Sequence, residues 1–191
     1  MIYLNDNIEV LNVEEALKVV SKQRRQYTLR YIQENDRRLS LAVYLLLCEA
    51  LKKEYNIIEP PEFTFGLYGK PLLKGYSDIH FNLSHCQQAA LCVVSNNPVG
   101  CDVECVPKEL DMDICRHCFN NDEIAYIVTA EHPTIAFAEL WTKKEALLKL
   151  TGEGLTNNLP ELFHSQYSIR NCQICTHIAP NRSYVYSIAS M

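Results

Sequence analysis

The first half of the chain is dominated by apolar side chains at helical spacing. Residues 14–31 follow this pattern and are unusually basic, and the stretch from Asp36 to about Tyr55 is apolar on almost every side. We expect Asp36 to cap this second helix, which should be buried because a helix that is apolar all round avoids water. Pro60 and Pro61 end the helical pattern, and short strands are predicted around Phe63–Phe65, His80–Leu83 and Ala89–Val94.

The second half begins with strict alternation of side chains. Val99, Cys101, Val103 and Cys105 would face one side of a strand, and Gly100, Asp102 and Glu104 the other. Helices are predicted near 112–130 and over 134–151, the latter capped by Thr134 and closed by Gly152, and a last strand over 184–189.

Each half therefore combines a long buried helix with short antiparallel strands. This pattern predicts an α+β fold of two similar lobes, with an N-terminal lobe over residues 1–97 and a C-terminal lobe over residues 98–191. No internal repeat and no flexible linker is visible between them.

Composition narrows the functional classes. The chain has 18 Lys and Arg against 23 Asp and Glu in 191 residues, a formal net charge of −5, which disfavours a nucleic-acid-binding protein. The longest apolar run, Leu41–Cys48, is far shorter than the roughly 18 residues of a membrane span. The first nine residues carry acidic side chains where a signal peptide would be basic, so we expect a cytoplasmic protein without a membrane association.

Nine cysteines are scattered through apolar stretches, which does not resemble a secreted disulfide framework. The pairs Cys115/Cys118 and Cys172/Cys175 have the spacing of zinc ligands. Residues 119–171 separate the two pairs, however, far more than the roughly 15–20 residues of a zinc ribbon, and the second pair lies in a predicted strand that would point its thiols apart. Structural cysteines are therefore favoured over a zinc site.

Taken singly, the candidate catalytic residues have ordinary interpretations. Asp102 and Glu104 leave the same face of a strand and could share one cation, but such a pair is usually a solvated surface. Glu145 and Lys149, one helical turn apart, have the spacing of a surface ion pair. Ser84 and His85 could be a nucleophile and base, although neighbours in a strand point apart.

The order of these pieces is more informative than any of them alone. Gly69-Lys-Pro71, Phe81-Asn-Leu-Ser-His85, Gly100-Cys-Asp-Val-Glu104 and the segment from Leu140 to Gly154 follow one another along the chain. Over residues 20–155 this arrangement resembles the 4′-phosphopantetheinyl transferases of the broad, surfactin-synthetase-activating type. The resemblance implies two similar α+β lobes that are related by a pseudo-twofold axis. It also implies an enzyme that moves the phosphopantetheine arm of coenzyme A onto a serine of an apo acyl or peptidyl carrier protein, releasing adenosine 3′,5′-bisphosphate.

The resemblance also implies roles for individual residues. Asp102, Glu104 and Glu145 would hold Mg²⁺, and Glu145 would act as base, directly or through a metal-bound water. Lys149 would steady the departing bisphosphate. Coenzyme A would be bound by Ser84, His85, Lys70, Pro71 and Lys144, and Arg24, Arg30 and Arg38 would contact its 3′-phosphate and adenine. Two small departures from the family pattern are Cys86, where serine is usual, and Cys101.

The charge distribution agrees with an anionic substrate. Residues 22–38 hold six basic and two acidic side chains in an otherwise acidic chain, which would concentrate cations near the phosphates of coenzyme A. Phosphoryl transfer asks mainly for positioning and charge neutralisation. We expect a monomer. The alternatives are a carrier-protein-binding or coenzyme-A-binding module without activity, and a zinc-stabilised interaction domain.

Overall fold

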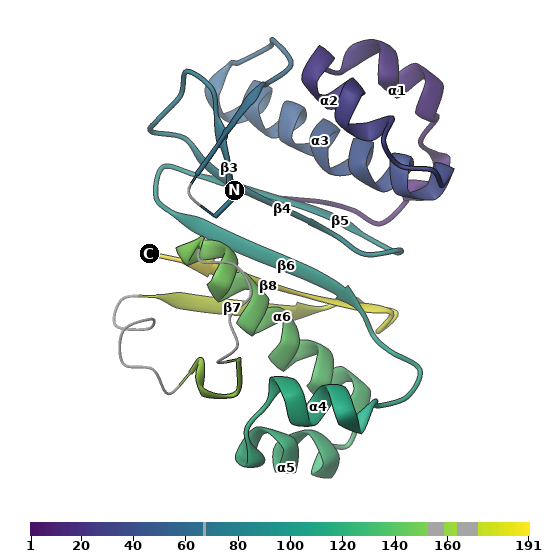
Figure 1. The fold of residues 1–191 in the computed structure, drawn as a ribbon, viewed down its shortest axis with the longest axis vertical. Coiled ribbons are helices and arrows are strands. Elements are labelled where there is room, and N and C mark those ends of the chain that lie inside the picture. Colours follow the sequence, from purple (N-terminus) through teal and green to yellow (C-terminus); the bar gives the residue numbers. More distant parts are fainter. Residues whose placement is uncertain (67, 153–158, 164–171) are drawn as a thin grey trace.

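The computed structural model describes residues 1–66, 68–152, 159–163 and 172–191. Its N-terminal half contains a three-stranded antiparallel sheet in the order β1-β5-β4, and the long helix α3 packs on one face of that sheet (Figure 1). The elements of this half are β1 (Ile2–Asn5), α1 (Val13–Val19), α2 (Lys22–Thr28), α3 (Glu34–Tyr55), the small hairpin of β2 (Phe63–Phe65) and β3 (Pro71–Leu73), β4 (His80–His85) and β5 (Ala90–Ser95).

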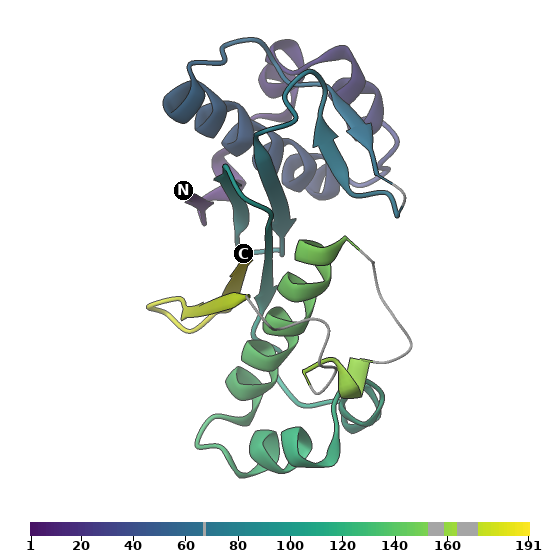
Figure 2. The ribbon, with the colours of Figure 1, turned by 90° about the vertical axis from the view of Figure 1, so that its left-hand side faces the viewer.

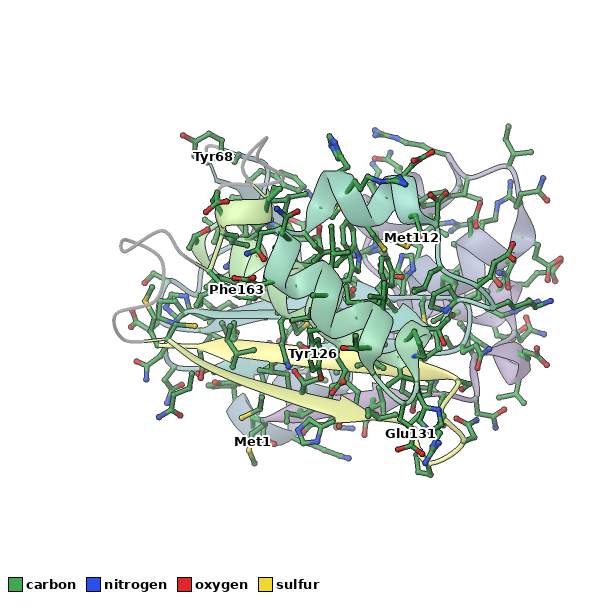
Figure 3. All side chains as sticks on the ribbon, turned by 90° about the horizontal axis from the view of Figure 1, so that it is seen from below. Met1, Tyr68, Met112, Tyr126, Glu131 and Phe163 are labelled. Atoms are coloured by element: carbon green, nitrogen blue, oxygen red, sulfur yellow. The ribbon has the colours of Figure 1, made fainter. Side chains whose placement is uncertain are left out.

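The C-terminal half contains a second antiparallel sheet, in the order β6-β8-β7, covered by the long helix α6. Its elements are β6 (Val99–Cys105), α4 (Met112–Cys118), α5 (Asn121–Thr129), α6 (Pro133–Thr151), β7 (Gln173–Ile178) and β8 (Tyr184–Ser190). Figure 3, seen from below, shows the short helices that carry Met112 and Tyr126 at this end of the molecule, nearest the viewer.

The two halves share one connectivity. In each, a first strand leads to a long helix, and a hairpin follows whose second strand inserts between the first strand and its own partner. The predicted α+β class is thus confirmed. The identical strand order supports the expectation of two similar lobes, whereas a pseudo-twofold axis and the boundary between residues 97 and 98 stay predictions.

The apolar core explains why the two long helices form where the sequence predicted them. Leu41, Tyr44 and Leu47 of α3 have essentially no exposed surface, as have Ala146 and Leu147 of α6. Both helices end at a residue in the left-handed conformation, which satisfies the last carbonyl groups: Asn56 (φ 55°) after α3 and Gly152 (φ 77°) after α6.

The helix starts differ from those expected. Gln33, not Asp36, occupies the cap position of α3, and Asp36 lies in the first turn, where a carboxylate interacts favourably with the helix dipole. Helix α6 begins at Pro133 after His132, so Thr134 is inside it and not its cap. The basic stretch 14–31 forms two helices because the Ser21 hydroxyl accepts a hydrogen bond from Arg24 N and starts α2.

The lobes meet where β4 lies beside β6 (Figure 2). Polar side chains of β4 bridge to the backbone of β6 there: the Cys101 N–H donates to Asn82 Oδ1 (2.9 Å) and the Val103 N–H donates to Ser84 Oγ (3.3 Å). Both pairs are 19 residues apart, so the two strands run parallel in a constant register. A third apolar cluster between the sheets, including Leu91, Val99 and Val103, completes the contact.

Within the described residues, no helix has the length and apolar character needed to cross a bilayer. All nine cysteines are free thiols.

Candidate active site

The site forms where α6 crosses β6 at close range, and Gly100 permits that approach. A Cβ atom at Gly100 would overlap the carbonyl oxygen of Ala146 and the amide nitrogen of Leu150 in α6. Because only glycine leaves this space empty, the face of α6 that carries Glu145 and Lys149 comes down onto the side of β6 that carries Asp102.

Asp102 is the buried centre of the site, with 2 % of its surface exposed. Its Oδ1 accepts hydrogen bonds from Lys149 Nζ (2.5 Å) and Ser84 Oγ (2.8 Å), and Lys149 also donates to Ser84 Oγ (3.1 Å). Its Oδ2 is buried without a hydrogen-bond partner. A buried carboxylate oxygen is costly to leave unpaired, so this atom is available to a cation or donor that the site receives.

Lys149 stays positively charged in this position. Burial alone lowers the pKa of its ammonium, but attraction to Asp102 outweighs that effect and the pKa is raised. The site therefore holds a fixed cation next to a fixed anion.

Two further carboxylates face the same region. Burial and the negative charge of Asp102 raise the pKa of Glu104 to about 7. Trp141 opposes this rise, because a hydrogen bond to the carboxylate favours its charged form. Burial and Asp102 also raise the pKa of Glu145, which Lys149 partly offsets. Asp102 thus destabilises the charged forms of both glutamates, as expected of carboxylates gathered in one small space.

Two adjoining pockets lead to this cluster. One, of about 280 Å³, is lined by the rings of Tyr27, Tyr31, Phe63 and Phe65 together with Arg24 and His85. The other, of about 290 Å³, is lined by Lys70, Asn82, Glu145, Leu148 and Lys149. Gly69, Pro71 and Leu83 belong to the walls of both, so the pockets form one continuous groove across the two lobes.

Arg24 supplies the cation of the aromatic pocket. Its guanidinium lies 4.8 Å from the ring centre of Tyr44 and 5.6 Å from that of Phe63, and it donates to Ser40 Oγ (3.1 Å). Its Nε is buried without a hydrogen-bond partner. Burial lowers the pKa of this group. His85 lines the same pocket, and its pKa is lowered by partial desolvation and by the positive charge of Lys149.

Lys70 joins the lobes beside the second pocket. Its ammonium donates to the backbone carbonyls of Val99 (3.2 Å) and Leu150 (3.1 Å), which ties the β2–β3 hairpin to the start of β6 and the end of α6. Burial lowers its pKa.

Comparisons with known proteins agree with this arrangement. Residues 98–188 match the sequence model of the 4'-phosphopantetheinyl transferase superfamily. The 4'-phosphopantetheinyl transferase gsp of Aneurinibacillus migulanus is 37% identical over 71% of this chain and 57% of its own length. A 4'-phosphopantetheinyl transferase of Bacillus subtilis is 30% identical over 81% of this chain and 70% of its own length, and psf-1 of Bacillus pumilus is 31% identical over 82% and 68%. The chain belongs to the 4'-phosphopantetheinyl transferase family. The predicted family and the predicted class of enzyme are confirmed.

Most of the residues expected in the active site of this transferase are brought together. Asp102, Glu104, Glu145 and Lys149 meet at the crossing of β6 and α6, and Ser84 bonds directly to Asp102 and Lys149. Lys70, Pro71 and His85 line the groove that leads to them.

The three expected arginines are not brought together. Arg24 lies in the aromatic pocket, whereas Arg30 is exposed and lines neither pocket. Arg38 donates to the carbonyl of Leu11 (3.2 Å) and pairs with Glu34 (2.6 Å), beside a separate polar cavity. A shared 3′-phosphate site of all three arginines does not match this placement.

Lys144 is also remote from the site. It has no exposed surface, and its ammonium donates to Glu123 Oε2 (2.7 Å), the carbonyl of Leu159 (2.7 Å) and the carbonyl of Cys118 (3.0 Å). Three acceptors saturate an ammonium group. Lys144 therefore holds the C-terminal lobe together and has no hydrogen left for a substrate anion.

We expect Lys144→Met to destabilise the protein without touching the groove. The substitution leaves the Glu123 carboxylate, which also accepts from Asn120 N, without its buried cation, and breaking such a pair costs about 3 kcal/mol or more. The melting temperature should fall by roughly 6–12 °C for a chain of this size. Lys143→Met, the adjacent substitution, is the control and should melt like the wild type. A Lys144→Met protein that melts within 1 °C of the wild type would contradict this role.

Two contributions were missed by sequence reasoning. The nearby sequence does not indicate that Gly100 is needed for helix packing. The atoms that a Cβ at this position would overlap lie on a helix some 46 residues later. Asn82 bridges β4 to β6, and the only sign of this is its alternation with Ser84 on the same face of the strand.

Proposed function

We propose that the protein transfers the 4′-phosphopantetheine group of coenzyme A to a serine hydroxyl of an apo carrier protein in the presence of Mg²⁺, releasing adenosine 3′,5′-bisphosphate. The observation that carries the proposal is the continuous groove, which has an aromatic and cationic end at Arg24 and an acidic and cationic end at Glu145 and Lys149.

The nucleotide end of coenzyme A suits the aromatic pocket. Four aromatic rings offer flat apolar surfaces to a nucleobase, and the buried, unpartnered Nε of Arg24 offers an N–H to the 3′-phosphate. Pro71 and Leu83 then lead towards the second pocket, where Lys70 and Lys149 are placed to neutralise the pyrophosphate.

Mg²⁺ is implied by the family, and the acidic residues fit it. The buried Oδ2 of Asp102 has no partner, and Glu104 and Glu145 share its surroundings, so a hard cation would relieve their mutual repulsion. Among the described residues, no three acidic, histidine or cysteine side chains form a preassembled metal cluster, and Lys149 bonds to Oδ1. When bound, Mg²⁺ would neutralise charge on the pyrophosphate.

The residues of the chain supply the remaining chemistry. Glu145 lines the second pocket, where its carboxylate would take the proton of the carrier serine. Lys149, held protonated by Asp102, stabilises the negative charge of the departing bisphosphate. A binding module without activity would have no use for three mutually repelling carboxylates. A monomeric state and a cytoplasmic location stay predictions.

Intact-mass analysis tests the function. Apo acyl and peptidyl carrier proteins are incubated with the enzyme, coenzyme A and Mg²⁺, and the intact mass of each carrier is measured before and after. Addition of one phosphopantetheine group to the carrier serine supports the proposal. Binding of coenzyme A without any mass change in any carrier would favour the non-catalytic alternative.

We expect Arg24 and not Arg38 to distinguish coenzyme A from dephospho-coenzyme A. A charge-assisted hydrogen bond to the 3′-phosphate is worth about 1.5–3 kcal/mol, so the wild type should prefer coenzyme A by roughly 10- to 150-fold in kcat/KM. Arg24→Gln should lose most of this preference. Arg38→Gln is the matched control and should keep it, because Arg38 is bound to Leu11 and Glu34 outside the groove. The opposite pattern would place the 3′-phosphate at Arg38.

A further inference from the structure

Two cysteines lie at the edge of the active site, one on each lobe. Cys86 directly follows His85 at the end of β4, and Cys105 directly follows Glu104 at the end of β6. Neither residue has a part in the proposed reaction, and Cys86 is one of the two positions at which the sequence departs from the family pattern.

The register of the two strands brings these thiols together. The Cys101 N–H donates a hydrogen bond to Asn82, and the Val103 N–H donates one to Ser84. The same offset of 19 residues places Cys86 beside Cys105 as the next pair along the two strands. Two other observations agree with the register. Cys105 packs against the apolar cluster that contains Cys86, and the two thiols interact directly through their side chains.

Their surroundings differ in a way that suits stepwise oxidation. Cys86 is buried beside Cys105. Cys105 is partly exposed and is thus the thiol that an oxidant can reach. Cys92 and Cys101, the other cysteines of this region, have no exposed surface.

We propose that Cys86 and Cys105 form a redox modification site, in which a reversible disulfide links the two lobes and switches the transferase off. With hydrogen peroxide as oxidant, the Cys105 sulfur takes one peroxide oxygen as a sulfenic acid and releases one water. The Cys86 sulfur then displaces the hydroxyl group, its proton leaves with that group as a second water, and the S–S bond forms. Two thiols and one peroxide thus give one disulfide and two waters, and a thiol reductant reverses the change.

The disulfide acts on the site through the residues that precede each cysteine. At the two preceding positions of the register, β4 and β6 are joined by hydrogen bonds and not by a covalent bond. A disulfide fixes the distance between two Cα atoms within a narrow range. It would therefore hold His85 and Glu104 in one relative position and prevent the adjustment that brings substrate and metal contacts together. This consequence rests on the proposed function, whereas disulfide formation does not.

Mass spectrometry of the full-length enzyme tests the modification directly. Reduced enzyme, freed of reductant and coenzyme A, is treated with a small excess of hydrogen peroxide, blocked with N-ethylmaleimide and digested without reduction. Trypsin alone leaves both cysteines in residues 75–108, but additional cleavage before Asp78 and Asp102 separates residues 78–101 from residues 102–108. We expect these two peptides to be joined by a disulfide in the wild type. Loss of the link in both Cys86→Ser and Cys105→Ser identifies its ends.

Transfer activity is measured on the same samples. We expect peroxide to lower wild-type kcat/KM at least tenfold and dithiothreitol to restore it, while Cys86→Ser and Cys105→Ser stay active throughout. Cys175→Ser, which removes an exposed cysteine of β7, is the control and should remain sensitive. Absence of the linked peptides in the wild type, a link without loss of activity, or equal inactivation of Cys105→Ser would each overturn the proposal. Linked peptides in an enzyme that modifies no carrier when reduced would instead contradict the proposed function and support the modification site.

Discussion

Glu145→Gln is expected to lower phosphopantetheine transfer by at least a hundredfold and to leave the fold unchanged. Glutamine has the shape of glutamate but cannot accept a proton, and general-base catalysis typically contributes a factor of 10² to 10⁴. Stability should not suffer, because the glutamate carboxylate is disfavoured by burial and by the charge of Asp102, and both penalties disappear in the neutral side chain. Single-turnover rates with saturating coenzyme A, together with thermal unfolding, measure the two effects separately.

Glu139→Gln is the matched control for this experiment. Glu139 lies on the same helix but lines neither pocket of the groove, so its neutralisation should change the rate less than twofold. If Glu145→Gln kept more than a tenth of the wild-type rate, a barrier change below about 1.4 kcal/mol, Glu145 would not be the base.

The fold could be predicted from the sequence as far as local signals extend. Helices α3 and α6 were anticipated within a few residues because their apolar stretches are long and are followed by Pro60 and by Gly152. Helix starts were less accurate, since Asp36 and Thr134 are good capping residues that the chain uses inside the first turn instead. The shared strand order of the two sheets depends on pairings between distant segments, such as β1 with β5, for which no local pattern exists.

The site could be predicted where helical and strand spacing carry the information. Asp102 and Glu104 share one face of β6, and Glu145 and Lys149 are one turn apart on α6, so each pair points in one direction. Lys144 shows how the same rule could have excluded a residue. It directly precedes Glu145, and one step along a helix turns a side chain by about 100°, away from the groove and into the core.

Exposure was the part of the site that local patterns misjudged. The ordinary interpretation of an acid pair two residues apart was a solvated strand surface, yet Asp102 is buried under α6 and beside β4. Similarly, Arg38 belongs to the same basic segment as Arg24 but lies outside the groove. Ser40 of α3 bonds to Arg24, and Arg38 is two residues away from Ser40, on nearly the opposite side of the helix. Charge density along the sequence predicts an anion site but does not select the arginine that faces it.

Gly100→Ala is expected to destabilise the protein by about 3 kcal/mol and to abolish transfer as well. The added methyl group would overlap the backbone of α6 at Ala146 and Leu150, where no side chain can rotate to make room, and such overpacking typically costs 1–3 kcal/mol and occasionally more. Helix α6 must then move away from β6. Because the contact between Lys149 and Asp102 spans these two elements, the displacement disrupts the active site and the core together.

Thermal unfolding and transfer rates test this prediction, with Gly66→Ala as the control. A Cβ atom at Gly66 would meet only the carbonyl oxygen of Lys70, at an ordinary 3.6 Å, so that variant should melt like the wild type. For Gly100→Ala we expect the melting temperature to fall by roughly 6–12 °C and the rate to fall even at temperatures where the variant is folded. A folded Gly100→Ala enzyme with wild-type turnover would show that the site tolerates a shifted helix, and the assignment of Asp102 and Lys149 to one rigid constellation would then be wrong.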